Sequence, residues 1–230
     1  MGGRVCVVTG ANRGIGREVA RQLALGGDLV VLTARDLRKA ERAAGELHAG
    51  TVEARQLDVS DAASVQRFAR EVGQAHGRVD VLVNNAAIHY DTWQRAVDAD
   101  LTVVREALET NLLGAWEVTQ ALLPLLRASA HGRVVNVSSE AGSLASMGSG
   151  TPAYAVSKAG LNALTKMLAA ELRRDGILVN AVCPGWVATD MGGPGGRPVS
   201  EGAASVLWAV ELGDGGPTGG FYRDGRPVPW

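Results

Sequence analysis

A tyrosine and a lysine four residues apart, Tyr154 and Lys158, have the residue types and the spacing of a proton-transfer pair. On a helix this spacing places the phenol and the ammonium on the same face, one turn apart. A phenol titrates at about 10, which is too high for proton transfer at neutral pH, and a neighbouring cation lowers that pKa because it favours the phenolate. The pair therefore predicts a proton donor and acceptor. The alternative is a solvent-exposed helix face that carries the spacing by chance.

The segments before this pair place it at the edge of a sheet. Thr151 and Pro152 are typical of a helix N-cap and the first helical position, so Tyr154 is expected in the first turn. Residues 133–138 have the pattern of a buried strand, and Ser139 follows its carboxyl end. Ligands bind at that edge of an open parallel sheet. Serines after a strand are also common turn formers, so one of the two serines is expected to be structural.

A glycine-rich turn near the N-terminus has the features of a dinucleotide site. The apolar run 5–8 predicts a buried parallel strand, which leads through Gly10, Gly14 and Gly16 into a helical pattern ending at Leu25. Glycines allow a close approach to a pyrophosphate, whose charge is met by free N–H groups of the helix N-terminus. The spacing G-x3-G-x-G differs from the common G-x-G-x-x-G fingerprint. Its position between a strand and a helix nevertheless favours cofactor binding over an ordinary loop.

Six motifs in this order resemble those of the short-chain dehydrogenase/reductase family. They are the turn Thr9 to Gly16, Asn84-Asn85-Ala86, Asn111, Ser139, Tyr154-x-x-x-Lys158 and Pro184-Gly185. The resemblance covers residues 4–191, and the stretches 33–36 and 184–191 look more narrowly like the NADPH-dependent carbonyl reductases of that family. It implies an α/β fold, with a single Rossmann-type doubly wound domain over residues 1–230 and a seven-stranded parallel sheet. The implied reaction is reversible hydride transfer to a carbonyl.

Four catalytic roles are implied by the same resemblance. Ser139 would bind the carbonyl oxygen, and Tyr154 would donate the proton. Lys158 would lower the pKa of the phenol and hold the nicotinamide ribose. Asn111 would anchor a water that relays protons to Lys158; its alternative is an exposed polar residue in a long helix, where asparagine is a poor former. The Ser-x-x-Gly spacing to Gly142 selects Ser139 from the two adjacent serines.

Cofactor choice depends on the end of the second strand. NAD sites place an acid there for the ribose 2′-OH, whereas NADP sites place an arginine nearby. The predicted strand ends at Thr33, so the acidic position falls to Ala34, and Arg35 follows it. Arg13 in the glycine-rich turn adds a second guanidinium, and two guanidiniums suit a 2′-phosphate. NADPH is therefore the expected cofactor, and Asp36 is expected to cap the next helix.

Further cofactor contacts follow from the resemblance. Asp58 is expected beside the adenine, with helix capping as the alternative and Asp61 competing for that role; Thr189 and Val187 are expected beside the carboxamide. No metal is expected. The residues expected to contact NADPH are Gly10, Asn12, Arg13, Gly14, Ile15, Gly16, Arg35, Leu57, Asp58, Val59, Asn84, Ala86, Tyr154, Lys158, Pro184, Val187 and Thr189.

Alternating strand-like and helical patterns predict the doubly wound parallel sheet from the residues themselves. The long helical pattern runs from about residue 102 to 128, and the Gly/Pro-rich segment 192–198 predicts a mobile loop over the site. The strand-like runs are residues 4–9, 29–33, 52–57, 79–84, 133–138, 178–183 and 220–222.

Composition limits the class of function. The chain has 230 residues, 46% of them hydrophobic, which is enough for one core. A net charge of −1 argues against nucleic-acid and membrane-surface partners. The pattern lacks a membrane span and the layout of a signal peptide. The two cysteines, Cys6 and Cys183, lie in apolar strand-like runs and are expected to be buried thiols, so a reducing, cytoplasmic location is expected.

The expected partner is a small-molecule carbonyl compound. Its pocket is expected to be open and broad, because the segment between Met191 and the next helix is short. Trp186 is the expected pocket wall, with Ile88, His89, Trp93 and Met191 as further candidates. Physiological alcohol oxidation and non-catalytic NADP(H) binding are the alternative functions. The helical segments 112–126 and 159–172 are apolar over much of their surface, which predicts a homodimer or homotetramer.

Overall fold

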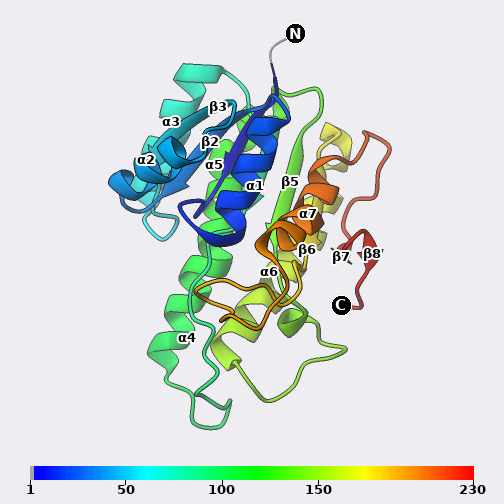
Figure 1. Ribbon diagram of the computed structural model, residues 1–230. Helices are drawn as coiled ribbons and strands as arrows, with labels where there is room; N and C mark the ends of the chain where they lie inside the picture. The colour runs from blue at the N-terminus through cyan, green and yellow to red at the C-terminus, as the bar shows by residue number, and fades with distance from the viewer. Residues whose placement is uncertain (1–2) are drawn as a thin grey trace.

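One eight-stranded sheet organises the chain, in the order β3-β2-β1-β4-β5-β6-β7-β8 (Figure 1). The computed structural model describes residues 3–230. Strands β1 to β7 pair in parallel, and β8 pairs antiparallel with β7. The strands are β1 (Val5–Val8), β2 (Leu29–Ala34), β3 (Thr51–Gln56), β4 (Val81–Asn84), β5 (Arg133–Val137), β6 (Leu178–Val182), β7 (Phe221–Arg223) and β8 (Arg226–Pro227). The predicted doubly wound fold is confirmed. The predicted strand count was one too low, because the two residues of β8 show no periodicity.

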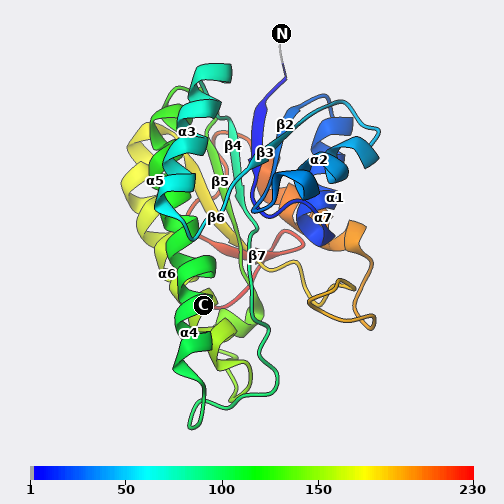
Figure 2. The ribbon, with the colours of Figure 1, turned by 90° about the vertical axis from the view of Figure 1, so that its left-hand side faces the viewer.

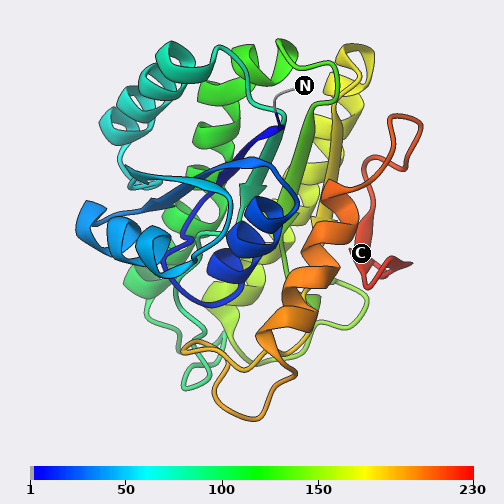
Figure 3. The same ribbon diagram turned by 45° about the horizontal axis from the view of Figure 1, so that its top comes forward.

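Helices cover both faces of the sheet (Figure 2). Helices α1 (Gly14–Leu25), α2 (Leu37–Glu46) and α7 (Val199–Val210) pack on one face, and α1 and α7 lie side by side (Figure 3). Helices α3 (Ala62–His76), α5 (Gly114–Arg127) and α6 (Pro152–Leu172) pack on the other. Side chains alternate across each strand, so Val8 joins the first core and Val7 the second. Burial on both faces explains the continuous apolar strands.

The strand order reverses between β1 and β4, and this reversal opens a crevice at their carboxyl ends. Thr9, directly after β1, joins the two strands there. Its hydroxyl accepts hydrogen bonds from the backbone N–H groups of Asn85 at 2.9 Å and Ala86 at 3.0 Å. The fold therefore places the glycine-rich turn beside the segment that follows β4.

The predicted helix over residues 102–128 is continuous but is not α-helical throughout. Helix α4 (Leu101–Leu108) passes through a π-helical turn, Glu109–Leu113, into α5. A π turn carries an extra residue and is frequently found at functional sites. Asn111 lies in this turn and is 1% exposed. The predicted alternative, an exposed polar residue, is therefore wrong.

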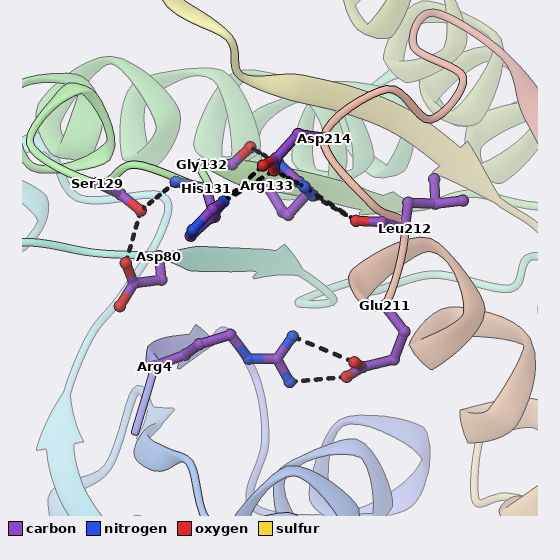
Figure 4. A network of polar contacts seen from close by, with 9 residues as sticks. All are labelled: Arg4, Asp80, Ser129, His131, Gly132, Arg133, Glu211, Leu212 and Asp214. Atoms are coloured by element: carbon purple, nitrogen blue, oxygen red, sulfur yellow. Dashed lines mark hydrogen bonds and ion pairs between the residues drawn. The ribbon is translucent and has the colours of Figure 1, made fainter. Parts of the chain in front are cut away.

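Arg133 ties the amino end of β5 to the segment that follows α7 (Figure 4). Its guanidinium donates to the Leu212 carbonyl at 2.9 and 3.1 Å and to the Asp214 carboxylate at 2.7 Å. The Arg133 side chain is 5% exposed, whereas that of Asp214 is 58% exposed. This network lies at the sheet edge opposite to the crevice, so it supports the fold without contacting the site.

Replacing Arg133 by methionine is expected to lower the free energy of unfolding by about 2 kcal/mol, because the Leu212 carbonyl loses a charged donor. Urea unfolding measures this change. Asp214→Asn is the matched control and should leave the unfolding midpoint almost unchanged, since Asp214 is largely exposed to solvent. An Arg133→Met protein as stable as the parent would show that water replaces the guanidinium.

Candidate functional site

Two adjoining pockets form one cleft along the carboxyl edge of the sheet. Both include Asn12, Arg13, Ala34 and Arg35, so they are continuous from α2 to the start of α6. Most of the predicted cofactor residues line this cleft, namely Gly10, Asn12, Arg13, Gly14, Ile15, Arg35, Leu57, Asp58, Val59, Ala86, Tyr154, Lys158, Pro184 and Thr189. Five predicted site residues are not in its lining: Gly16, Asn84, Asn111, Ser139 and Val187.

The glycine-rich turn has room for a pyrophosphate and little room for side chains. Gly10 and Gly14 have positive φ angles of 61° and 57°, which side-chain-bearing residues rarely adopt. A Cβ atom on Gly10 would lie 2.9 Å from the Ala86 Cα, and one on Gly16 would collide with the Asn85 amide. Arg13, at the N-cap of α1, makes no side-chain cap, and Gly14 and Ile15 at the start of the helix line the cleft. These residues fit a dinucleotide phosphate.

The far end of the cleft is lined by both cations and carboxylates. Lys39 and Arg42 of α2 line it together with Arg13 and Arg35, beside the carboxylates of Asp36, Glu46 and Asp58. Lys39 and Arg42 were missed from the sequence, although they are three residues apart, which is the spacing of a shared helix face. Asp36 accepts a hydrogen bond from the Arg38 N–H at 2.9 Å, which confirms its predicted role as the cap of α2.

Asp58 lines the same end of the cleft. Its carboxylate accepts hydrogen bonds from the N–H and the hydroxyl of Ser60 at 3.0 and 2.7 Å. The cap of α3 is instead Asp61, which accepts from the Ala63 N–H at 3.0 Å. The alternative role of Asp58 as the cap of this helix is therefore wrong, and its contact with adenine stays a prediction.

The Arg13 side chain reaches across the cleft and forms an ion pair. Its guanidinium lies 2.8 Å from the Asp190 carboxylate, in the segment after β6, and both residues line the cleft. The two side chains are 69% and 73% exposed, so solvent weakens this pair. A bound 2′-phosphate would compete with Asp190 for Arg13. Sequence patterns gave no signal of this partner, which is distant along the chain.

Tyr154 and Lys158 lie on one face of the first turns of α6, as predicted. The Lys158 ammonium lies 5.5 Å from the centre of the Tyr154 ring and donates to the Val137 carbonyl at 2.7 Å. Lys158 is 2% exposed, and burial lowers its pKa to about 8. Burial also raises the pKa of the Tyr154 phenol, with the Ser139 hydroxyl acting in the opposite direction. The predicted lowering of the phenol pKa is wrong for this structure, because desolvation outweighs the effect of the Ser139 hydroxyl.

The two adjacent serines have different surroundings. Ser138 is 1% exposed and donates to the Asn162 Oδ1 at 2.6 Å, so it is the structural serine. Ser139 caps the short turn Glu140–Gly142, where its Oγ accepts from the Ala141 N–H at 3.2 Å. A Cβ atom on Gly142 would lie 2.6 Å from the Lys158 backbone, which explains the glycine three residues after Ser139. Ser138 lines the cleft, but the Ser139 hydroxyl is the group that acts on the pKa of the Tyr154 phenol, which favours Ser139 as the serine beside Tyr154.

Asn111 holds two backbone segments near the site. Its Oδ1 accepts from the Ile88 N–H at 2.8 Å, and its Nδ2 donates to the Ile88 carbonyl at 3.0 Å. The same Nδ2 donates to the Ser157 hydroxyl at 3.0 Å. Asn111 thus links the segment after β4 to helix α6.

Asn84 lies in the core of the sheet and not in the cleft. It is 4% exposed, and its Nδ2 donates to Thr119 Oγ1 at 3.0 Å and Asn136 Oδ1 at 2.8 Å. Asn85 reaches the glycine-rich turn instead, donating to the Gly10 carbonyl at 3.1 Å. The sequence could not separate the two asparagines, because adjacent residues at a strand end point to opposite faces.

The start of α6 is at Pro152, as predicted, but its cap comes from elsewhere. Thr151 has a φ of 51° and makes no side-chain cap. The Asp91 carboxylate accepts instead from the N–H groups of Ala153 at 2.9 Å and Tyr154 at 3.1 Å. The prediction of a Thr151 cap is therefore wrong, since a distant side chain already bonds the orphan donors.

The segment 192–198 is anchored, in contrast to the predicted mobile loop. Backbone bridges pair Val187 with Arg197 and Thr189 with Gly193, and Arg197 forms an ion pair with Asp224 at 2.8 Å. Trp186 packs on this segment, donating from its indole to the Gly192 carbonyl at 2.7 Å. Of the five candidate pocket residues, Ile88 and Met191 line the cleft, and Trp186, His89 and Trp93 do not.

The cysteines and the potential metal ligands of residues 3–230 offer no second reactive site. Cys6 and Cys183 are free and buried, as predicted, and burial raises the pKa of both thiols, which opposes a nucleophilic role. Within residues 3–230 no group of His, Cys, Asp or Glu is arranged to hold a metal ion. None of the helices in this range is both long and apolar enough to cross a membrane.

Known proteins resemble this chain over most of its length. The chain is 35% identical to carbonyl reductase 1 (NADPH) of Sus scrofa, covering 99% of this chain and 94% of the pig protein. It is 37% identical to the 3-oxoacyl-(acyl-carrier-protein) reductase of Escherichia coli, covering 82% of this chain and 75% of the E. coli protein. The crystal structure of NADPH-bound carbonyl reductase from chicken fatty liver superposes with a TM-score of 0.88 and 30% identity, covering both chains completely. A model of the short chain dehydrogenase family matches residues 4–197. The chain therefore belongs to the short-chain dehydrogenase family.

Proposed function

We propose that the protein is an NADPH-dependent carbonyl reductase that acts on a ketone, an aldehyde or a quinone. The observation that carries this proposal is the continuous cleft that joins the cationic end at Arg35 to Tyr154 and Lys158. The cationic end suits a 2′-phosphate, and the opposite end has a phenol beside a buried ammonium. The relatives with NADPH and carbonyl reductase in their names support the same assignment.

NADPH, when bound, would supply the hydride. Tyr154 would donate a proton to the carbonyl oxygen, and its raised pKa keeps the phenol protonated at neutral pH, as reduction requires. Ser139 would donate a hydrogen bond to the same oxygen. The Lys158 ammonium would stabilise the phenolate that remains after proton transfer.

Asn111 is proposed to anchor a water that returns a proton towards Lys158. Its Oδ1 accepts one hydrogen bond, from the Ile88 N–H, in this structure. A carbonyl oxygen has two lone pairs, so the same atom has capacity to accept from a water. The contacts of its Nδ2 with Ile88 and Ser157 fix the orientation of the amide.

Carbonyl-dependent oxidation of NADPH is the test of this function. A panel of ketones, aldehydes, quinones and a 3-oxoacyl thioester would identify the substrate class. Faster NADP+-dependent alcohol oxidation than carbonyl reduction would favour the alternative physiological direction. Tight NADPH binding with no turnover on any panel member would favour the non-catalytic regulatory alternative.

The rate of carbonyl reduction is expected to fall as the pH rises through about 8, where buried Lys158 loses its proton. The raised pKa of Tyr154 keeps the proton donor intact over this interval. The pH dependence of kcat/KM measures the groups of the free enzyme. Lys158→Arg should move the descending limb to higher pH, because a guanidinium stays charged. A descending limb at the same pH in both proteins would assign it to another group.

A homodimer or homotetramer remains a proposal. Leu113 of the π-helical turn and Val156 and Met167 of α6 are exposed apolar side chains on the helices concerned. Burial of these side chains in a symmetric contact would favour association. Light scattering that shows only monomer at micromolar concentration would contradict it. A cytoplasmic location is also proposed, since two free thiols suit a reducing compartment, and cell fractionation would test it.

A further inference from the structure

A buried carboxylate outside the four proposed catalytic residues holds the backbone of the proton donor. Asp91 is 0% exposed and lies between β4 and α4. Its Oδ1 accepts from the Tyr154 N–H at 3.1 Å, and its Oδ2 accepts from the Ala153 N–H at 2.9 Å. These are orphan donors in the first turn of α6, where a negative charge also interacts favourably with the helix dipole. The position of Tyr154 therefore depends on Asp91.

The carbonyl of Tyr154 is held by the same part of the chain. It accepts from the Ser157 hydroxyl at 2.8 Å, and Ser157 in turn accepts from Asn111. Asn111 bonds both backbone groups of Ile88, three residues before Asp91. Hydrogen bonds thus join both backbone groups of Tyr154 to the segment 88–91: the N–H directly to Asp91, and the carbonyl through Ser157 and Asn111 to Ile88.

The orientation of the Asp91 carboxylate is itself fixed. Gln94 donates to its Oδ2 at 3.1 Å and accepts, through Oε1, from the Asp100 N–H at 2.7 Å. Tyr90, adjacent to Asp91, places its ring edge-to-face with the Tyr154 ring at 5.3 Å. The segment 88–91 therefore contacts both the backbone and the ring of Tyr154. Ile88 of the same segment lines the cleft.

We propose that Asp91 is a positioning residue, which sets the place of the Tyr154 phenol relative to a carbonyl bound in the cleft. This inference rests on the proposed reductase function. The carboxylate binds two N–H groups at once, so it fixes the backbone from which the Tyr154 side chain extends. A misplacement of about 1 Å at a reacting group costs about 100-fold in rate.

Asp91→Asn tests this inference, because the amide keeps the volume but turns one acceptor into a donor that faces an N–H group. We expect kcat to fall about 10- to 100-fold, with the dissociation constant for NADPH unchanged. The deuterium isotope effect on hydride transfer should increase, since the chemical step becomes slower than product release. Asp61→Ala is the matched control: it removes the cap of α3, which should cost stability without changing kcat or the isotope effect.

A parental kcat and isotope effect in Asp91→Asn would overturn the inference. So would a lower kcat that is explained by a smaller fraction of folded protein with an unchanged isotope effect. If Asp91→Asn does not fold, Gln94→Met removes the amide that orients Asp91, together with its bond from the Asp100 N–H. About a threefold to tenfold fall in kcat is then expected from a smaller displacement. A Gln94→Met protein with the parental kcat and isotope effect would likewise overturn it.

Failure of the proposed function would be recognised separately, as a parental protein without activity on any carbonyl. The NMR signals of the Tyr154 ring protons then report the position of the ring, because the ring current of Tyr90, edge-to-face at 5.3 Å, shifts them. Tyr154→Phe identifies these signals by their absence. Changed shifts in Asp91→Asn, but not in Asp61→Ala, would support positioning by Asp91. Identical shifts in the parental and Asp91→Asn proteins would overturn it.

Discussion

Tyr154→Phe is expected to lower kcat for carbonyl reduction by about 1,000-fold, within the range that a positioned proton donor contributes. The substitution removes only the hydroxyl and keeps the ring that packs against Tyr90. Because Lys158 is bonded to the Val137 carbonyl and not to the phenol, its position should not change. Binding of NADPH should therefore remain at the parental strength. Stopped-flow single turnovers and fluorescence titration of NADPH measure the two quantities.

Tyr222→Phe is the control for this experiment, since it removes a hydroxyl from a strand residue outside the cleft. It should leave kcat unchanged. Carbonyl reduction that persists at the parental rate in Tyr154→Phe would mean that another group donates the proton. A rate that falls together with NADPH affinity would instead show that the hydroxyl holds the cofactor.

Arg35→Ser is expected to raise the KM for NADPH by about 10- to 100-fold while changing the KM for NADH little. A charge-assisted hydrogen bond to phosphate is worth about 1.5–3 kcal/mol, which corresponds to that range. Arg35 lines both pockets, whereas the guanidinium of Arg13 is already paired with Asp190. The loss of Arg35 should therefore act on the 2′-phosphate, the group that NADH lacks. Steady-state kinetics with both cofactors measure the ratio.

Arg38→Ser is the matched control, because Arg38 lies three residues after Arg35, in the first turn of α2, and does not line either pocket. It removes the same charge, so any general electrostatic effect on an anionic cofactor appears in both variants. We expect its KM values for both cofactors to stay within about twofold of the parent, since long-range surface electrostatics are screened. An equal rise in KM for NADPH and NADH in Arg35→Ser would show that Arg35 contacts a part common to both cofactors.

Features that depend on neighbouring residues along the chain were predictable from the sequence. The apolar runs predicted the parallel strands, since a strand buried on both faces needs no polar alternation. The spacing of Tyr154 and Lys158 follows from helix geometry, and the cap of α2 by Asp36 needs only the following residues. The glycine-rich turn was predicted because glycines allow a tight turn and a close approach to a pyrophosphate, and Gly10 and Gly14 have positive φ angles there.

Features that depend on long-range contacts were decided by the tertiary structure. Asp91 caps a helix that begins 61 residues later, so its role has no local signature. Asn84 and Asn85 differ only in the face to which each side chain points. The pairing of Arg13 with Asp190 requires two loops to meet across the cleft. The raised pKa of the Tyr154 phenol follows from desolvation, and burial is a property of the packed chain and not of the local sequence.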